Sequence, residues 1–152
     1  MVRRGKGLVE GTTRRTPGIS LEAIFLRAAE GLPERDGRAE VVAHALGHLQ
    51  RGFDAHYGFG PGGATDDGVL VGDNAYALSV ETIARLDEPR FVAVAGRMIR
   101  DGAGRIASGE PVTVETWTPH LAGLLDIVSG EGADGSEERV RLAARELRDG
   151  PE

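Results

Sequence analysis

The chain has 152 residues, of which 40% are hydrophobic and 28% are charged, and this size and composition are typical of a single globular domain. It contains no cysteine, which excludes disulfides, thiolate nucleophiles and cysteine-based metal sites. Residues 1–18 carry five basic residues and one acid, a balance of +4, so the total charge of −6 leaves −10 on the remainder, which argues against a nucleic-acid-binding surface.

Residues 1–18 are rich in glycine, threonine and arginine and show no hydrophobic periodicity. They predict a flexible basic arm, which is followed by a helical domain at residues 19–150. Ser20 is a typical N-cap for a first helix, which Gly31 and Pro33 end. No apolar run reaches the roughly 20 residues of a membrane helix, and no secretory signal follows the basic residues, so we expect a cytoplasmic protein without a transmembrane segment.

A second helix is predicted from Arg38 to about Asp54, because apolar residues recur along one face. This apolar stripe consists of Val42, Leu46, Leu49 and Phe53. Gly47 and Gly52 weaken the helix, and such glycines are tolerated where another backbone comes close. Glycine fills five positions of the stretch 58–68, which predicts a loop.

Four more helices are predicted after this loop. Either Asp66 or Asp67 caps the third helix, and the Asp-Glu-Pro turn at 87–89 ends it and starts the fourth. Pro119, which follows a β-branched stretch, predicts the start of the fifth helix, and Ser136 predicts the N-cap of the sixth. Helices joined by short loops indicate helix-on-helix packing, so we predict an all-α fold with a single bundle of about six helices.

His44 and His48 lie four residues apart and share a helix face, with Asp54 and His56 downstream. Two histidines at this spacing can bind zinc when a third ligand arrives. Ala45 stands where the HExxH motif of zinc peptidases has its glutamate, so that general base is missing. A metal-dependent enzyme that uses these histidines and Asp54 is one interpretation. Half-exposed polar histidines are the simpler one, and we expect no metal on this chain.

Asp73 lies within the first turns of an otherwise apolar helix, in the sequence VLVGDNAYALSVETIARL. A carboxylate among apolar residues needs a specific partner, because burying an unpaired charge is costly. Two interpretations stay open at this point. Asp73 is either a paired carboxylate with a structural or interface role, or a residue on an exposed helix face.

The segment 69–91, VLVGDNAYALSVETIARLDEPRF, resembles the helix of trans-polyprenyl diphosphate synthases that begins with a VLAGD-like turn. The segment 95–110, AGRMIRDGAGRIASGE, is similar to the following helix of that family. Upstream, GTTRRTP at 11–17 stands at the position of a GGKRLRP-like phosphate-binding motif and keeps Arg14, whereas threonines replace two of its cationic residues. The resemblance extends loosely over residues 11–148 and implies a truncated isoprenoid-synthase-like fold.

Two aspartate-rich motifs carry the chemistry of that family, because several carboxylates and Mg²⁺ ions neutralise the diphosphate leaving group. At the position of the first motif this sequence reads QRGFDAHYGF, in which Asp54 is the only acid. The second motif is expected beyond residue 148, and the sequence given ends at residue 152. This combination resembles the small component of two-component hexaprenyl and heptaprenyl diphosphate synthases. In those chains the first motif is reduced to a remnant similar to Asp54-Ala55-His56.

The resemblance implies a non-catalytic subunit that binds no cofactor alone. Its partner would be a large subunit that has both motifs and carries Mg²⁺, in a heterodimer or heterotetramer. The small subunit would help set the length of the prenyl diphosphate product, which supplies the side chain of an isoprenoid quinone, as in menaquinone biosynthesis. The remnants of the substrate motifs are then Arg14, Asp54 and His56. The bulky side chains that limit the product tunnel are Leu49, Phe53 and Tyr76.

An alternative from a different class is also open. Many small helical proteins act by binding other proteins, and an amphipathic helix with a Gly-Asp step also occurs in such bundles. The alternative is therefore a helical interaction or regulatory protein that is unrelated to prenyl transfer.

Overall fold

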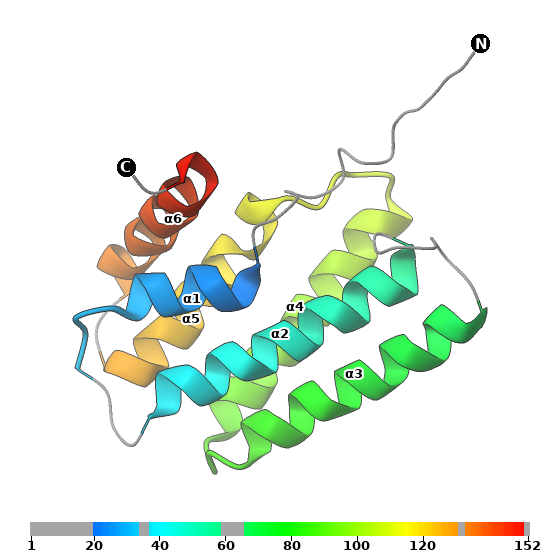
Figure 1. Cartoon of the computed structure of the whole chain (residues 1–152), viewed down its shortest axis with the longest axis horizontal. Helices are drawn as coiled ribbons and strands as arrows, with labels where there is room; N and C mark the ends of the chain where they lie inside the picture. The colour runs from blue at the N-terminus through cyan, green and yellow to red at the C-terminus, as the bar shows by residue number, and fades with distance from the viewer. Residues whose placement is uncertain (1–19, 34–36, 59–65, 131–132, 151–152) are drawn as a thin grey trace.

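The computed structural model describes most of the chain, namely residues 20–33, 37–58, 66–130 and 133–150. The predicted arm at 1–18, with Arg14, lies outside these ranges. The described residues form six helices and no strand, so the prediction of an all-α bundle is confirmed (Figure 1). The helices are α1 (Leu21–Ala29), α2 (Arg38–Tyr57), α3 (Asp66–Ala84), α4 (Pro89–Ala107), α5 (Val114–Ser129) and α6 (Ala133–Asp149).

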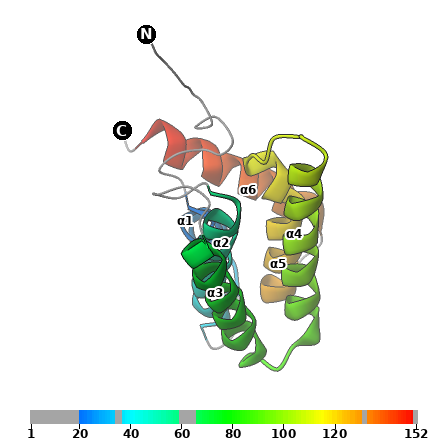
Figure 2. The same ribbon diagram turned by 90° about the vertical axis from the view of Figure 1, so that its right-hand side faces the viewer.

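Helix α2 is the central element of the bundle, since it contacts α1, α3, α4 and α5. Helix α3 lies antiparallel beside α2 at the outer edge of the fold (Figure 1). Helix α6 packs against α1 and α5 and runs across one end of the bundle (Figure 2). The largest fully buried side chains fill the space between the helices and include Phe25, Leu46, Phe91, Met98, Leu121 and Leu125.

Both ends of α1 have the polar partners that a short helix needs. The Ser20 hydroxyl accepts a hydrogen bond from the Ala23 N–H at 2.9 Å, which confirms the predicted N-cap. At the other end, the guanidinium of Arg139 donates to the carbonyl oxygens of Ala28 at 3.0 Å and Glu30 at 2.6 Å. Helix α6 therefore satisfies carbonyls that α1 leaves free at its C-terminus.

The predicted start of the fifth helix at Pro119 is wrong, because α5 begins at Val114 and contains this proline. The hydroxyl of Thr116 accepts a hydrogen bond from the Thr113 N–H at 3.1 Å, which satisfies a free donor at the helix start. The earlier start also brings Trp117 into the core, where its side chain is buried. Burial of this large side chain outweighs the single intrahelical hydrogen bond that the proline removes.

The predicted N-cap at Ser136 is wrong as well, because α6 begins at Ala133. Ser136 is buried in the first turn of α6, and its hydroxyl donates a hydrogen bond to the Asp126 carboxylate of α5. A buried hydroxyl needs a hydrogen-bond partner, and α5 supplies one. The serine therefore joins two helices instead of capping one.

Helices α2 and α3 approach closely because each presents a glycine to a ring of the other. A Cβ atom at Gly52 would lie 2.6 Å from the Tyr76 ring and 3.0 Å from the carbonyl oxygen of Gly72. A Cβ atom at Gly72 would overlap the His56 ring and lie 3.0 Å from the carbonyl oxygen of Gly52. We call these four residues the α2–α3 interlock. The prediction that Gly52 lies where another backbone comes close is confirmed.

Gly52→Ala is expected to lower the free energy of unfolding by about 1–3 kcal/mol, because overpacking costs more than the gain of about 1 kcal/mol in helix propensity. Gly96→Ala is the matched control in α4, where an added Cβ would meet nothing within 4 Å. It should stabilise the protein by up to about 1 kcal/mol. Urea denaturation followed by circular dichroism measures both values, and stabilisation by both substitutions would contradict the interlock.

The predicted turn at 87–89 is present and is organised by Glu88. Asp87 adopts a left-handed backbone conformation with φ of 56°. The Glu88 carboxylate accepts hydrogen bonds from the backbone N–H of Arg90 at 3.2 Å and from its guanidinium at 2.9 Å. These bonds to Arg90 lower the pKa of Glu88 to about 2. Glu88 therefore caps α4 as a charged carboxylate, with Pro89 at the first helical position.

Glu88→Gln tests this charged cap through the pH dependence of stability. The pKa of Glu88 falls from its ordinary value of 4.5 to about 2 on folding, so its stabilisation is complete above pH 4.5 and is lost as the pH falls toward 2. We expect the Tm of the wild type to exceed that of Glu88→Gln above about pH 5. The two Tm values should converge as the pH falls, and a difference that is independent of pH would contradict the assignment.

Candidate functional site

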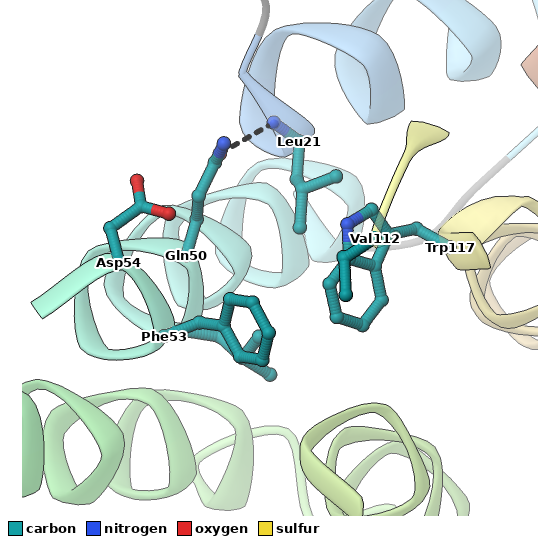
Figure 3. A pocket seen from close by; sticks show the side chains of 7 residues that line it. Leu21, Gln50, Phe53, Asp54, Val112 and Trp117 are labelled. Carbon is teal, nitrogen blue, oxygen red and sulfur yellow. Dashed lines mark hydrogen bonds between the residues drawn. The ribbon is translucent and has the colours of Figure 1, made fainter. Parts of the chain in front are cut away.

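A small apolar pocket opens between the start of α1, the second half of α2 and the segment that leads into α5 (Figure 3). Its cavity volume is about 20 Å³, which is room for about one water-sized group. The lining residues are Leu21, Leu49, Gln50, Phe53, Asp54, Val112 and Trp117. Five of these seven side chains are apolar, so the pocket favours an apolar group as its ligand.

The aromatic wall of the pocket consists of Phe53 and Trp117. Their rings meet in a T-shaped arrangement with centroids 5.4 Å apart. Both rings also press on Gly102 of α4, where an added Cβ would lie 2.5 Å from Phe53 and 2.7 Å from Trp117. The glycine therefore allows two rings from different helices to share one wall, and their mutual contact fixes the shape of the pocket.

Gln50 and Asp54 supply the polar part of the lining. The Gln50 side-chain oxygen accepts a hydrogen bond from the Leu21 N–H at 2.8 Å, which ties the start of α1 to α2 (Figure 3). Asp54 lies one turn further along α2, is partly buried and is the only acidic residue in the lining. A single carboxylate can accept a hydrogen bond from a ligand, but a magnesium–diphosphate site requires several oxygen ligands.

Asp73 has its partner across the α2–α3 interlock. The Nε2 atom of His56 lies 2.8 Å from Oδ1 of Asp73, and the His56 ring stacks on Tyr76 with centroids 5.1 Å apart. The Asp73 side chain is nevertheless 63% exposed. Asp73 is therefore paired, as the first interpretation holds, and also lies on an exposed helix face, as the second holds. An ion pair at such a surface position contributes about 1 kcal/mol at most. The pair joins α3 to α2 and lies outside the pocket lining.

Tyr76 does not line the pocket that Leu49 and Phe53 share. Its ring lies over Gly52, and its hydroxyl is buried with no hydrogen-bond partner among the described residues. Burial raises the pKa of Tyr76 above its ordinary value, and neighbouring groups, including Asp54, act in the same direction. Of the three predicted tunnel residues, the structure thus brings two together and places the third in the interlock.

The two histidines in the middle of α2 contact each other. The rings of His44 and His48 meet edge to face with centroids 4.8 Å apart. His48 Nδ1 lies 2.6 Å from a guanidinium nitrogen of Arg51, which can only donate, so this ring nitrogen is the acceptor. Burial, and then the charges of Arg51 and His44, lower the pKa of His48. In the described part of the chain, no group of three or more histidine, aspartate or glutamate side chains could hold a metal ion.

Four of the lining residues were not identified from the sequence as site residues, namely Leu21, Gln50, Val112 and Trp117. They come from the start of α1, the face of α2 beside its apolar stripe, and the segment around the start of α5. Tertiary packing alone brings these segments together, so no spacing in the sequence relates them. Trp117 is the only tryptophan of the chain, and that rarity is the one signal that singles it out.

The described residues form a small helical bundle with a small apolar pocket that one carboxylate helps to line. Comparison of the chain with protein-family models, curated proteins and solved structures finds no match. Among the described helices, none combines the length and hydropathy needed to cross a membrane. A function for this chain is therefore inferred from its residues and their geometry.

The pocket is expected to admit a small apolar probe such as xenon, and Trp117 should report the binding through a change in its fluorescence. Val112→Phe places a larger side chain in the lining and should abolish the change. Leu142→Phe is the matched control, because Leu142 is 46% exposed on α6 and is not part of the lining. Circular dichroism verifies that both variants fold, and a fluorescence response that survives in folded Val112→Phe would contradict binding in this pocket.

Proposed function

We propose that this chain is the small regulatory subunit of a heteromeric trans-polyprenyl diphosphate synthase and helps set the length of its product. The product would be the prenyl diphosphate that supplies the side chain of an isoprenoid quinone such as menaquinone. The residue resemblance at 69–110 motivates the proposal. One observation carries it: Leu49 and Phe53 line a single apolar pocket, and Asp54, where the first aspartate-rich motif would fall, lines it with them.

The chemistry of the pocket supports a role in limiting a prenyl chain. A growing prenyl chain is apolar, so its transfer from water to an apolar surface is favourable by about 25 cal/mol per Å² of buried surface. The lining contains leucine, valine and aromatic side chains, which offer such a surface. In this proposal, their bulk sets how far a chain extends. A side chain at the blind end of a product channel would therefore fix product length by exclusion.

The polar side of the pocket supports a complex in which one subunit binds the metal ions and the other binds the apolar product. Ionisation of an allylic diphosphate requires metal ions to neutralise the leaving group. In this pocket Asp54 is the sole carboxylate, whereas Mg²⁺ sites use several oxygen ligands. In this proposal the catalytic partner holds Mg²⁺ on two aspartate-rich motifs, and the residues of this chain bind and limit the apolar product.

Co-expression with a full-length polyprenyl diphosphate synthase subunit that has both motifs tests the proposal. The two chains should co-purify, and the labelled products from isopentenyl diphosphate should differ in length from those of the large subunit alone. Phe53→Leu removes ring bulk and should lengthen the product by at least about one five-carbon unit, since exclusion sets the limit. Leu142→Ala, on the exposed surface of α6, should leave the length unchanged.

Two results would contradict the proposed function. One is turnover of isopentenyl diphosphate and an allylic diphosphate by the small chain alone. The other is an unchanged product length in the presence of the small chain.

A helical interaction protein unrelated to prenyl transfer is the second candidate function. The exposed apolar residues of α3, such as Leu70 and Val71, favour it because a solvent-exposed apolar surface often marks a protein–protein contact. Both candidates require binding to another protein. The product-length assay separates them, because only the first candidate changes the products of a prenyl transferase.

A further inference from the structure

Helix α3 presents most of the exposed apolar bulk in the described part of the chain. Seven large hydrophobic side chains are exposed there, and five of them are on α3. These five are Val69, Leu70, Val71, Leu78 and Val80. The side chains of Leu70 and Val71 are 68% and 58% exposed, which is unusual for adjacent branched residues.

The exposed side of α3 follows from its place at the edge of the bundle. Among the described helices, α3 contacts only α2 and α4 (Figures 1 and 2). Its buried face consists of Gly72, Ala75, Ser79, Thr82 and Ile83. At 100° per residue, Leu70 and Ala77 lie roughly opposite Ser79, at the centre of the outward face. The described chain thus leaves Leu70, Val71, Ala77 and Leu78 exposed within about 120° of the helix circumference, and we call this surface the outer face of α3.

The outer face of α3 is also acidic. Asp67, Asp73 and Glu81 are exposed on this helix, and no lysine or arginine occurs within it. At 100° per residue, all three acids fall within about 60° of Leu70. Along the helix axis, Asp67 and Glu81 lie at the two ends of the apolar stretch 69–80, so acids and apolar residues share the outer face. A partner that covers this face must therefore bring apolar side chains and positive charge together.

A second copy of this chain fits the outer face poorly. A two-fold antiparallel pairing of α3 with itself, centred on Asn74 in the middle of the apolar stretch, places Glu81 opposite Asp67 of the second copy. The symmetry repeats this contact, so two pairs of like charges face each other across the interface. Like charges at such positions oppose association.

We infer that the outer face of α3 docks a helix of a different protein, with an apolar stripe flanked by lysine or arginine. The charge pattern carries this choice, because basic residues opposite Asp67 and Glu81 replace repulsion by attraction. The identity of that protein as the catalytic large subunit rests on the proposed function. The position of the docking surface is independent of the proposed function.

The test uses the full chain and the co-expressed large subunit, with Kd measured by surface plasmon resonance. Leu70→Asp should weaken binding at least about tenfold, because it buries a charge at the centre of the contact. Leu142→Asp is the matched control on α6 and should change Kd by less than about twofold, since it lies outside the outer face. Both variants are first verified as folded by circular dichroism.

Glu81→Lys adds a second readout that a general loss of structure cannot produce. It should weaken binding to the large subunit and raise the tendency of the small chain to dimerise, because lysine would then face Asp67 of a second copy. Sedimentation velocity measures the dimer. Weaker partner binding together with stronger self-association supports the inference.

Three outcomes would overturn the inference. The first is a large subunit that binds wild type and Leu70→Asp equally well, which leaves the proposed function intact but places the interface elsewhere. The second is a wild-type dimer that Leu70→Asp dissociates, which makes a second copy the occupant. The third is an absence of binding to the large subunit with unchanged product length, which removes the proposed function and the partner together.

Discussion

Helices α2 and α3 each place an aromatic or imidazole ring on a glycine of the other helix, and these two contacts determine how closely the helices lie. Gly52 receives the Tyr76 ring, Gly72 receives the His56 ring, and no Cβ fits at either position without displacing a ring or a carbonyl group. Because helix packing distances depend on the side chains at the contact, two glycines allow the backbones of α2 and α3 to approach each other. The Gly-Asp step of α3 has a direct explanation here. Gly72 makes room for His56, and Asp73 binds its ring nitrogen at 2.8 Å.

The position of α2 in this contact also determines the pocket. Phe53 follows Gly52 directly, so its side chain lies about 100° around the helix, on the face that adjoins the interlock. There it meets Trp117 across Gly102, which accepts two rings as Gly52 accepts one. Only seven residues of the chain are Phe, Tyr or Trp, and three of them lie on these glycines. At these two contacts, glycine and aromatic rings determine how closely the helices pack, whereas aliphatic side chains fill most of the remaining core.

Much of the fold could be predicted from local signals in the sequence. Ser20, the turn at 87–89 and the apolar stripe of α2 act within a few residues, and each prediction based on them is confirmed. Pro119 and Ser136 misled the prediction because each carries a strong local signal that tertiary packing overrides. Burial of Trp117 moves one helix start, and the bond from Ser136 to Asp126 gives the other residue a different role.

The candidate site was less accessible to sequence analysis than the fold. Leu49 and Phe53 were identified as a bulky pair on one helix, and they do share a pocket. Val112 and Trp117 were not identified, because their proximity to α2 depends on how the chain returns through α4 and α5. The partner of Asp73 was also beyond local pattern, since His56 belongs to the preceding helix and the two residues are separated by a glycine-rich stretch.

The outer face of α3 combines two properties that oppose each other in an isolated chain. Exposure of its apolar residues to water costs about 25 cal/mol per Å², so these residues favour any association that covers them. Its acidic residues disfavour association with copies of the same chain, since the copies present the same charges. A basic helix from another protein relieves both costs at once, because it covers the apolar residues and neutralises the acids. Attraction and selectivity therefore arise from one set of side chains on the one face that the interlock leaves open.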